Sequence, residues 1–214
     1  MKSSSFLILL LLLVALPVSA HEESSTAATN RQPVVLVAFP TKPDQFRDDL
    51  RPFVERIIAR HGFEEWNTVV LVHELHRHLG VFSVLGAKMG LRARELLGAS
   101  LDDLRVESHA GFKPPVSCFN DGLQVATGAS LGRGTITVSD EDKPVPEAVF
   151  VFGDKRLRLR VKADVLEKVR KSMQAVSGDM NSPAVRRVSI EAWAELDRAK
   201  IFDEFFEQPL GPTK

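Results

Sequence analysis

Three of the six histidines, His73, His76 and His78, lie close together in the sequence, and the only cysteine, Cys118, follows further along the chain. Imidazole and thiolate are the ligands that zinc and similar borderline-soft metals prefer. A thiol beside a histidine can also act as a nucleophile, with the histidine as its base. These four residues are therefore candidates for an active centre, and their use depends on the elements that position them.

Whether His76 and His78 can share a metal depends on the backbone conformation between them. On an α-helix, residues i and i+2 are separated by about 200° around the axis, so the two rings could not share a metal. In an extended segment the same residues point to one face and can converge. We therefore expect a strand to end at this motif, followed by a turn at Leu79-Gly80 and a helix from Val81. His73 would point elsewhere along such a strand.

Cys118 lies at the expected start of another helix, for which Ser117 is a plausible N-cap. Unpaired N–H groups and the helix dipole stabilise a thiolate at such a position. Asp121 follows one turn later on the same face, where it could be a partner of a ligand, a fourth ligand or a proton acceptor. The alternatives are a buried small cysteine and histidines that are polar residues of a surface turn.

Residues 1–20 are predicted to be a signal peptide. Lys2 precedes an apolar run from Phe6 to Leu16, and Val18-Ser19-Ala20 supplies the small residues that cleavage requires. The run is shorter than the roughly 20 residues of a membrane span, so an uncleaved anchor is the less favoured alternative. We expect an exported protein, periplasmic or secreted, with no membrane attachment after cleavage.

The 28 basic and 28 acidic residues give a formal net charge of zero. This balance leaves no basic footprint for nucleic acid or for an anionic membrane surface. A single cysteine cannot form a disulfide within its own chain, even in an oxidising compartment. The 44% apolar content is enough for one hydrophobic core.

Strand and helix patterns follow one another without a regular βαβ rhythm, which predicts an α+β fold with one mixed core of antiparallel strands and helices. Expected strands are 33–39, 104–108 and 135–138, with a hairpin over 148–161 that turns at Gly153-Asp154. Expected helices are 44–61 with a restart at Pro52, 81–97, 117–126, 163–176 and 182–206. The predicted organisation is a signal peptide (1–20), a flexible leader (21–32), an α+β core (33–162) and a C-terminal helical segment (163–214).

Two blocks of the sequence resemble the signature of the FmdE domain family, which takes its name from formylmethanofuran dehydrogenase. The first, HRHLGVFSVLGAKMG, begins at His76 and is similar to H-G-H-L-[CG]-P…L-G-x-R-M-G. The second, PPVSCFNDGLQVATGASLGRG, begins at Pro114 and is similar to P-P-x-S-C-x-x-D-G-x-Q-x-x-T-G-C-T-L-G-K-G. The resemblance covers residues 63–161 and identifies the chain as an exported, bacterial-type member.

The resemblance implies an α+β core, often a homodimer, with a metal, commonly zinc, held by the H-x-H pair and the second-block cysteine. On this chain those positions are His76, His78 and Cys118. Arg77 stands where the family usually has glycine, and Ala129 replaces a cysteine. The loss of that second thiol points away from two-thiol chemistry and leaves a set of two histidines and one cysteine.

The function predicted from these observations is metal binding by an exported protein, with zinc or another divalent transition metal acting on a small substrate. Cys118 and Asp121 are the candidate catalytic residues, Asp121 as the proton acceptor for a metal-activated water. One alternative is a non-catalytic periplasmic metal carrier or sensor, in which His73 or Asp121 completes the metal's shell. Others are a metal-free thiol enzyme that uses Cys118 with a histidine base, and a structural domain whose site has decayed. The family name belongs to a complex that handles one-carbon units on methanofuran, which an exported protein is not expected to join.

Overall fold

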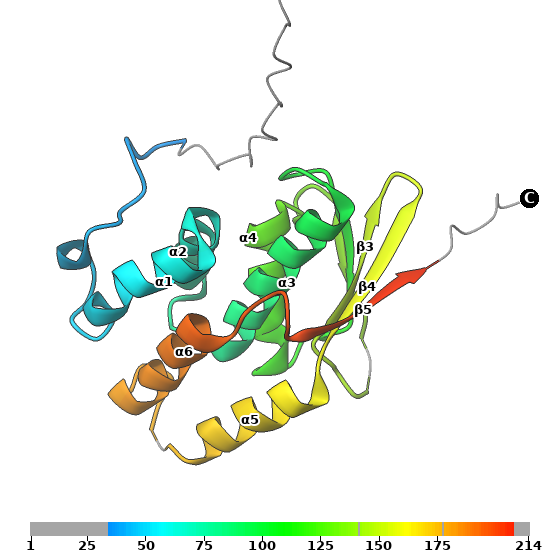
Figure 1. The fold of residues 1–214 in the computed structure, drawn as a ribbon. Helices are drawn as coiled ribbons and strands as arrows, with labels where there is room; N and C mark the ends of the chain where they lie inside the picture. The colour runs from blue at the N-terminus through cyan, green and yellow to red at the C-terminus, as the bar shows by residue number, and fades with distance from the viewer. Residues whose placement is uncertain (1–33, 141, 177, 208–214) are drawn as a thin grey trace, which may run out of the picture.

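One mixed sheet of five strands carries the fold, and the helices gather beside it (Figure 1). The structure is a computed structural model that describes residues 34–140, 142–176 and 178–207, so the predicted signal peptide and leader lie outside the described residues. The strands are β1 (Arg105–Ser108), β2 (Ile136–Val138), β3 (Glu147–Phe152), β4 (Lys155–Val161) and β5 (Phe202–Glu207). The helices are α1 (Val54–His61), α2 (Phe63–His76), α3 (Val81–Leu97), α4 (Phe119–Thr127), α5 (Ala163–Gln174) and α6 (Pro183–Glu195), with short 3-10 turns at Pro43–Gln45, Arg51–Phe53 and Val116–Cys118. The predicted α+β class is confirmed. Within the described ranges, no helix combines the length and the apolar character that crossing a membrane requires.

The two faces of the sheet differ in character. The strand order is β2-β1-β3-β4-β5, with β1 and β2 parallel and the other neighbours antiparallel. Along β4, Leu157 and Leu159 point into the core, as the two-residue period of a strand requires. Arg158 lies between them and pairs with Glu147 and Glu207, each at 2.6 Å. Strands β3 and β4 pair antiparallel on either side of Gly153-Asp154, which confirms the predicted hairpin. The sheet differs from the expected antiparallel core in one respect, because β1 and β2 are parallel.

Two predicted elements at the ends of the fold are wrong. Residues 34–38 form bends rather than a buried strand, and Val34, Val35 and Val37 are exposed. Strand propensity expresses how well a residue fits a half-buried pleated surface, and this segment contacts no such surface. The helix expected over 182–206 ends at Glu195, and Phe202–Glu207 forms β5 instead. Its aromatic residues pair antiparallel with β4, so the C-terminal segment completes the sheet.

The strand expected before the histidines is also wrong, because residues 63–76 form helix α2. Trp66, Val69 and Val72 of this helix are fully buried, and the Trp66 ring stacks on that of Trp193 with centroids 4.9 Å apart. A short apolar run looks the same in sequence whether it is a buried strand or the buried stretch of a helix. The predicted helix over 81–97 is confirmed. Of the helix expected over 44–61 only the second half forms, as α1 after the 3-10 turn that contains Pro52, whereas residues 44–50 are not α-helical.

Helix α3 lies between two hydrophobic cores. Leu85 and Met89 pack into the core formed with α4 and the sheet, whereas Val84 and Ala87 pack into the core formed with α1, α2 and α6. The helix is therefore apolar on most of its circumference, as expected of a central helix. Helices α2, α4 and α6 and strand β4 all contact it.

Helices α3 and α4 approach each other backbone to backbone. A Cβ atom built at Gly86 would overlap the carbonyl oxygen of Phe119, and one at Gly122 would overlap that of Ser83. One turn further, a Cβ at Gly90 would lie 2.6 Å from the Cβ of Ala126. Only glycine fits at such crossings. Its cost in helix propensity, about 1 kcal/mol per residue, is outweighed by the close packing it permits.

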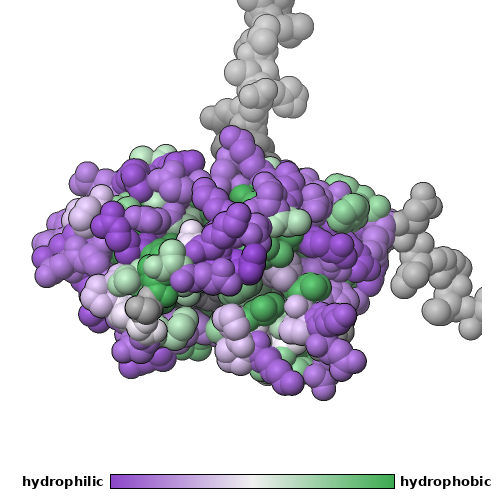
Figure 2. All heavy atoms as spheres, turned by 90° about the horizontal axis from the view of Figure 1, so that it is seen from below, coloured by the Kyte–Doolittle hydropathy of each residue, from purple (hydrophilic) through white to green (hydrophobic). Residues whose placement is uncertain are grey.

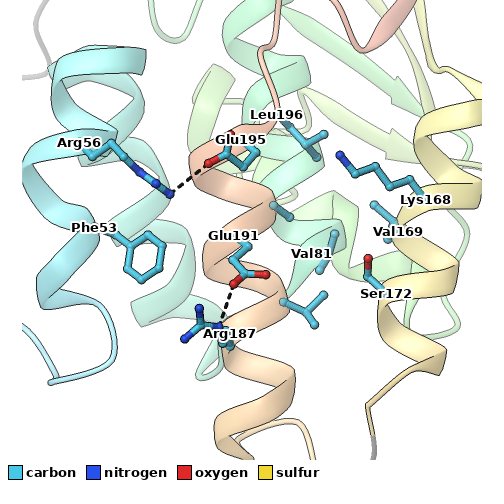
Figure 3. A pocket seen from close by; sticks show the side chains of 12 residues that line it. Phe53, Arg56, Val81, Lys168, Val169, Ser172, Arg187, Glu191, Glu195 and Leu196 are labelled. Atoms are coloured by element: carbon cyan, nitrogen blue, oxygen red, sulfur yellow. Dashed lines mark hydrogen bonds and ion pairs between the residues drawn. The ribbon is translucent and has the colours of Figure 1, made fainter.

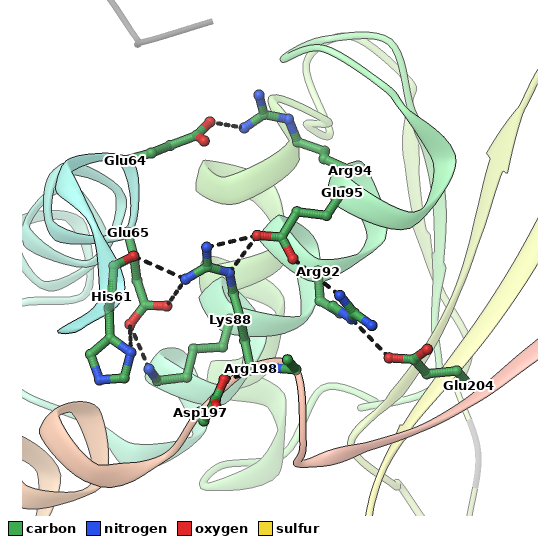
Figure 4. Close-up of polar contacts among 11 residues, drawn as sticks. His61, Glu64, Glu65, Lys88, Arg92, Arg94, Glu95, Asp197, Arg198 and Glu204 are labelled. Atoms are coloured by element: carbon green, nitrogen blue, oxygen red, sulfur yellow. Dashed lines mark hydrogen bonds and ion pairs between the residues drawn. The ribbon is translucent and has the colours of Figure 1, made fainter. Parts of the chain in front are cut away.

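A buried ion pair joins α2 to α3 (Figure 4). The Nζ of Lys88 donates to Glu65, and both side chains are 0% exposed. Arg198, in the segment before β5, pairs with Glu65 at 2.9 Å and with Glu95 at 2.7 Å. Burial lowers the pKa of Lys88, because a charged ammonium is costly without water. Glu65 therefore compensates a charge that has no access to solvent and connects three separate segments.

We expect Gly86→Ala to destabilise the protein by about 2 kcal/mol, because the added methyl meets backbone that cannot rotate away. Gly132→Ala is the matched control: nothing lies within 4 Å of its Cβ position, so its effect should stay within about 0.5 kcal/mol. Chemical denaturation followed by circular dichroism measures both values. Equal stabilities of the two variants would contradict the close helix contact.

We expect Glu65→Gln to cost about 3–5 kcal/mol, because it leaves the ammonium of Lys88 buried without a full counter-charge. Glu95→Gln removes a carboxylate that is 40% exposed, so its cost should remain below about 1 kcal/mol. Urea unfolding of the two variants gives the comparison. A loss of less than about 1 kcal/mol in Glu65→Gln would show that the buried pair is not fixed as described.

Candidate metal centre

The turn between α2 and α3 brings two histidine rings together. His76 is the last residue of α2, and Arg77 follows in the left-handed region with φ +67°, its N–H donating to the carbonyl of His73 at 2.9 Å. The ring centroids of His76 and His78 are then 4.0 Å apart. The predicted convergence of the two rings is present, but a left-handed helix end produces it, where an extended strand was expected. The same geometry explains why glycine is usual at the position of Arg77.

Helix α4 adds Cys118 and Asp121 to these rings. Cys118 is the N-cap residue of α4, one position later than the predicted cap Ser117 because a 3-10 turn over Val116–Cys118 precedes the helix. Asp121 lies in the first turn, and its Oδ2 is 2.6 Å from Nδ1 of His76. The start of α4 is itself anchored by Asn120, whose side-chain amide donates to the carbonyl of Gly111 at 2.9 Å.

The charges of the three histidines differ because their surroundings differ. The hydrogen bond to Asp121, followed by the nearby Cys118, raises the pKa of His76 to about 9. Burial, followed by the positive charge of His76, lowers the pKa of His78. Burial lowers the pKa of His73 to about 3, so this ring is neutral over the physiological range. At neutral pH the metal-free site therefore holds an imidazolium–carboxylate pair beside a neutral imidazole.

Each of the three clustered histidines has one buried ring nitrogen without a hydrogen-bond partner. Among the residues that the structure describes, these atoms are Nδ1 of His73 and the Nε2 atoms of His76 and His78, and the last two belong to the adjacent rings. Nε2 of His76 faces Gly80, where a Cβ atom would lie 3.3 Å away, so the absent side chain leaves space beside it. Buried polar atoms are normally satisfied, so a pair of adjacent unpartnered imidazole nitrogens requires an explanation. Metal ligation through these atoms is one explanation.

The side chains do not form a ready-made metal shell. In the described part of the chain, no three His, Cys, Asp or Glu side chains are grouped so that they could hold a metal ion. The structure does bring the predicted residues His76, His78, Cys118 and Asp121 to one place, whereas His73 turns away, its Nε2 3.4 Å from Oγ of Ser83. Their assignment as metal ligands stays a prediction.

Two cavities meet at Cys118. One has a volume of about 510 Å³ and is lined by His78, Cys118 and mostly apolar side chains from distant segments, including Val116, Val145 and Met173. The other, about 330 Å³, is lined by His76, Cys118 and Asp121 among others. Seen from below, the face that carries α5 shows hydrophobic residues among hydrophilic ones (Figure 2). Sequence reasoning missed the cavity walls, because Val145 and Met173 lie in no recognisable motif and only the fold brings them to Cys118.

We expect the imidazole of His76 in chelator-treated protein to titrate near pH 9 in a histidine NMR titration, because Asp121 stabilises its charged form. The folded-state pKa lies above the ordinary histidine value of 6.5, so the pair stabilises the fold fully below that pH and loses its contribution as the pH rises through 9. Asp121→Asn should move the midpoint toward 6.5 and remove this pH dependence of stability. A wild-type midpoint at or below 6.5 would contradict the pairing.

Two known proteins are similar to this chain, one in sequence and one in an alignment of structures. A protein from Archaeoglobus fulgidus, described as a probable S-adenosyl-L-methionine-binding protein, is 32% identical over 175 residues. The match covers 75% of this chain and 46% of the relative, so the chain spans about half the length of that protein. The solved structure of a tungsten formylmethanofuran dehydrogenase FmdE-like protein from Syntrophus aciditrophicus aligns over 81% of this chain and 79% of that one. The alignment has a TM-score of 0.40 and 13% identity.

The family model described as FmdE, molybdenum formylmethanofuran dehydrogenase operon, matches residues 75–209. The matched range is more than half of the chain. It begins one residue before His76 and includes Cys118, Asp121 and all five strands of the sheet. The chain therefore belongs to the FmdE family.

Proposed function

We propose that this FmdE-family protein binds zinc or a similar divalent transition metal through His76, His78 and Cys118. The observation that carries the proposal is the pair of buried, unpartnered Nε2 atoms on adjacent rings beside the only thiol. These are the ligand types that zinc prefers. Because the three side chains do not yet converge on one point, ligation requires rotation of the side chains toward one another.

Asp121 has a defined part in this proposal. Metal-bound histidines commonly donate their other ring N–H to a carboxylate, which fixes the orientation of the ring. The short contact between Nδ1 of His76 and Oδ2 of Asp121 provides that arrangement before any metal is present. Asp121 is also one-third exposed, so it could accept a proton from a water in the adjoining cavity. Asp121 favours the charged form of His76, in which both ring nitrogens carry a proton. A metal that binds Nε2 must displace the proton there, so the affinity of the site for the metal should rise with pH.

An open metal site favours an enzyme over a carrier. Three protein ligands leave one coordination position for water or substrate, and a metal in such a site supplies a Lewis acid and an activated water. A closed shell would need His73 or Asp121 as a fourth ligand. His73 instead lies near Ser83, and Asp121 is engaged by His76. We therefore propose a metal-dependent enzyme acting on a small molecule outside the cytoplasm, the location that the predicted signal peptide supports.

A metal-free thiol enzyme is the second candidate, because Cys118 lies beside a histidine. The proximity of the two side chains is reflected in the contribution of Cys118 to the raised pKa of His76. An imidazolium near a thiol favours the thiolate, the form that acts as a nucleophile. In this case a chelator would not change the reactivity of Cys118.

We expect purified protein to contain about one divalent metal ion per chain, as measured by elemental analysis, because two imidazoles and a thiolate form a complete catalytic-type ligand set. Cys118→Ser and His78→Ala should each lose most of the metal. His109→Ala is the matched control, since His109 lines neither cavity at Cys118, and it should retain the metal.

The reactivity of Cys118 then separates the two candidates. Metal ligation predicts slow alkylation that becomes faster when a chelator removes the ion. Protein that binds no metal after incubation with zinc, cobalt or nickel, and whose alkylation a chelator leaves unchanged, would rule out the metal proposal and favour the thiol enzyme.

A further inference from the structure

The larger cavity at Cys118 has the size of a ligand-binding pocket. Its volume of about 510 Å³ falls within the range that holds small organic molecules. Five segments build it: the turn before α3 with the start of that helix, the 3-10 turn before α4, the loop before β3, α5, and the segment between α5 and α6. Its walls include Val81, Val116, Val145, Leu166 and Met173.

The chemistry of this cavity is asymmetric. Apart from His78, Cys118, Arg170 and Gln174, every lining residue is apolar or glycine. The guanidinium of Arg170 is bound to Glu167 of its own helix, at 2.8–3.0 Å. The atoms able to bind a metal are therefore confined to His78 and Cys118. A ligand in the cavity would meet apolar surface except where it reaches these two side chains.

The second cavity that Cys118 lines has a mixed character. Ser117, Asn120, Asp121 and Gln124 contribute polar side chains to it, and apolar ones come from Phe112, Pro114, Leu131, Ile136 and Val138. Cys118 lines both cavities, while His78 lines the apolar one and His76 the mixed one. The candidate centre therefore borders an apolar cavity and a cavity of mixed polarity.

We propose that the apolar cavity binds the hydrocarbon tail of a small amphiphilic substrate, whose polar head lies at His76, His78 and Cys118. The mixed cavity, with Asp121, Asn120 and Gln124 in its lining, then gives water or a released polar product access to the same centre. This assignment rests on the proposed function for the head group. The tail-binding property itself follows from the cavity and can be tested without a metal.

A third cavity lacks the metal-binding side chains of the two at Cys118 (Figure 3). It lies between α1, α5 and α6, has a volume of about 390 Å³, and shares Val81 and Val169 with the apolar cavity. Four of its charged residues form two pairs, Arg56 with Glu195 at 3.1 Å and Arg187 with Glu191 at 2.8 Å, and Lys168 also lines it. No histidine or cysteine lines it, so we assign no chemistry to it.

The only cysteine of the chain gives a direct probe of the apolar cavity. In chelator-treated protein, Cys118 is alkylated with N-methyl-, N-ethyl-, N-butyl- and N-hexylmaleimide; the thiolate adds to the maleimide double bond, and a proton from water enters at the neighbouring carbon. We expect the rate, relative to that of glutathione, to rise by up to about three- to fourfold per added methylene that the cavity buries. The increase should level off when the tail fills the cavity. If the alkylation rate of Cys118 changes with chain length only as much as that of glutathione does, the proposal is overturned.

Two variants place the effect in the cavity. Met173→Asp and Val145→Asp introduce carboxylates from α5 and from the loop before β3. Both should abolish the dependence on chain length, measured within each variant as the ratio of its rate with N-hexylmaleimide to its rate with N-methylmaleimide. Lys171→Gln is the matched control, because it makes the same change of net charge at a side chain that is 72% exposed and lines neither cavity. Circular dichroism confirms folding of each variant. A chain-length dependence retained in both folded aspartate variants would place the tail elsewhere and contradict the assignment.

The metal-loaded protein tests the connection to the centre. Zinc-loaded protein should bind hexanohydroxamic acid at least about 30-fold more tightly than acetohydroxamic acid, since both present the same chelating head and differ in buried methylenes. Equal affinities with bound metal would overturn the tail pocket and leave the metal proposal standing. A chain-length dependence in alkylation, found in protein that binds no metal, would keep the pocket and overturn the proposed function.

Discussion

The close contact between α3 and α4 is the constraint on which the candidate centre depends. Helices with ordinary side chains at their crossing stand about 8–10 Å apart. Gly86 and Gly122 let each helix touch the backbone of the other, so α4 lies closer than side chains would allow. Because α3 begins directly after the histidine turn and α4 begins at Cys118, this one contact also fixes the distance between the two halves of the centre. The bond between His76 and Asp121 is a consequence of that spacing.

The other side of α3 fixes the helix that ends at His76. Lys88 and Glu65 form a buried pair between α3 and α2, and Trp66 stacks on Trp193 of α6. A buried ion pair adds little net stability, but any shift that separates its partners is heavily penalised. The pair therefore restricts how α2 can slide along α3, and with it the position of its last residue. Helix α3 thus has a glycine contact with α4 on one side and an ion pair with α2 on the other. Together these two contacts determine where the imidazole of His76 lies.

The sequence predicts most of the fold and the members of the site, but the physical reasons are only partly right. Regular patterns indicated the α3 helix and the β3–β4 hairpin, because their apolar residues recur at unambiguous periods. The strand expected before His76 was wrong, since a buried helix and a buried strand share the same short apolar run. The two rings nevertheless converge, because Arg77 adopts a left-handed conformation that no pattern of apolar residues encodes. The cavity walls, with Val145 and Met173, depend on contacts between distant segments and could not be read from local sequence.

Two positions of the histidine turn connect its backbone to its chemistry. Arg77 holds the left-handed conformation that closes α2, at a cost that glycine would avoid. Gly80 leaves room at Nε2 of His76, the atom that a metal would use. With Asp121 engaged by His76 and His73 directed toward Ser83, no fourth protein ligand stands ready within the described structure. The centre borders an apolar cavity and a cavity of mixed polarity, an arrangement that suits an exchangeable ligand better than a sealed storage site.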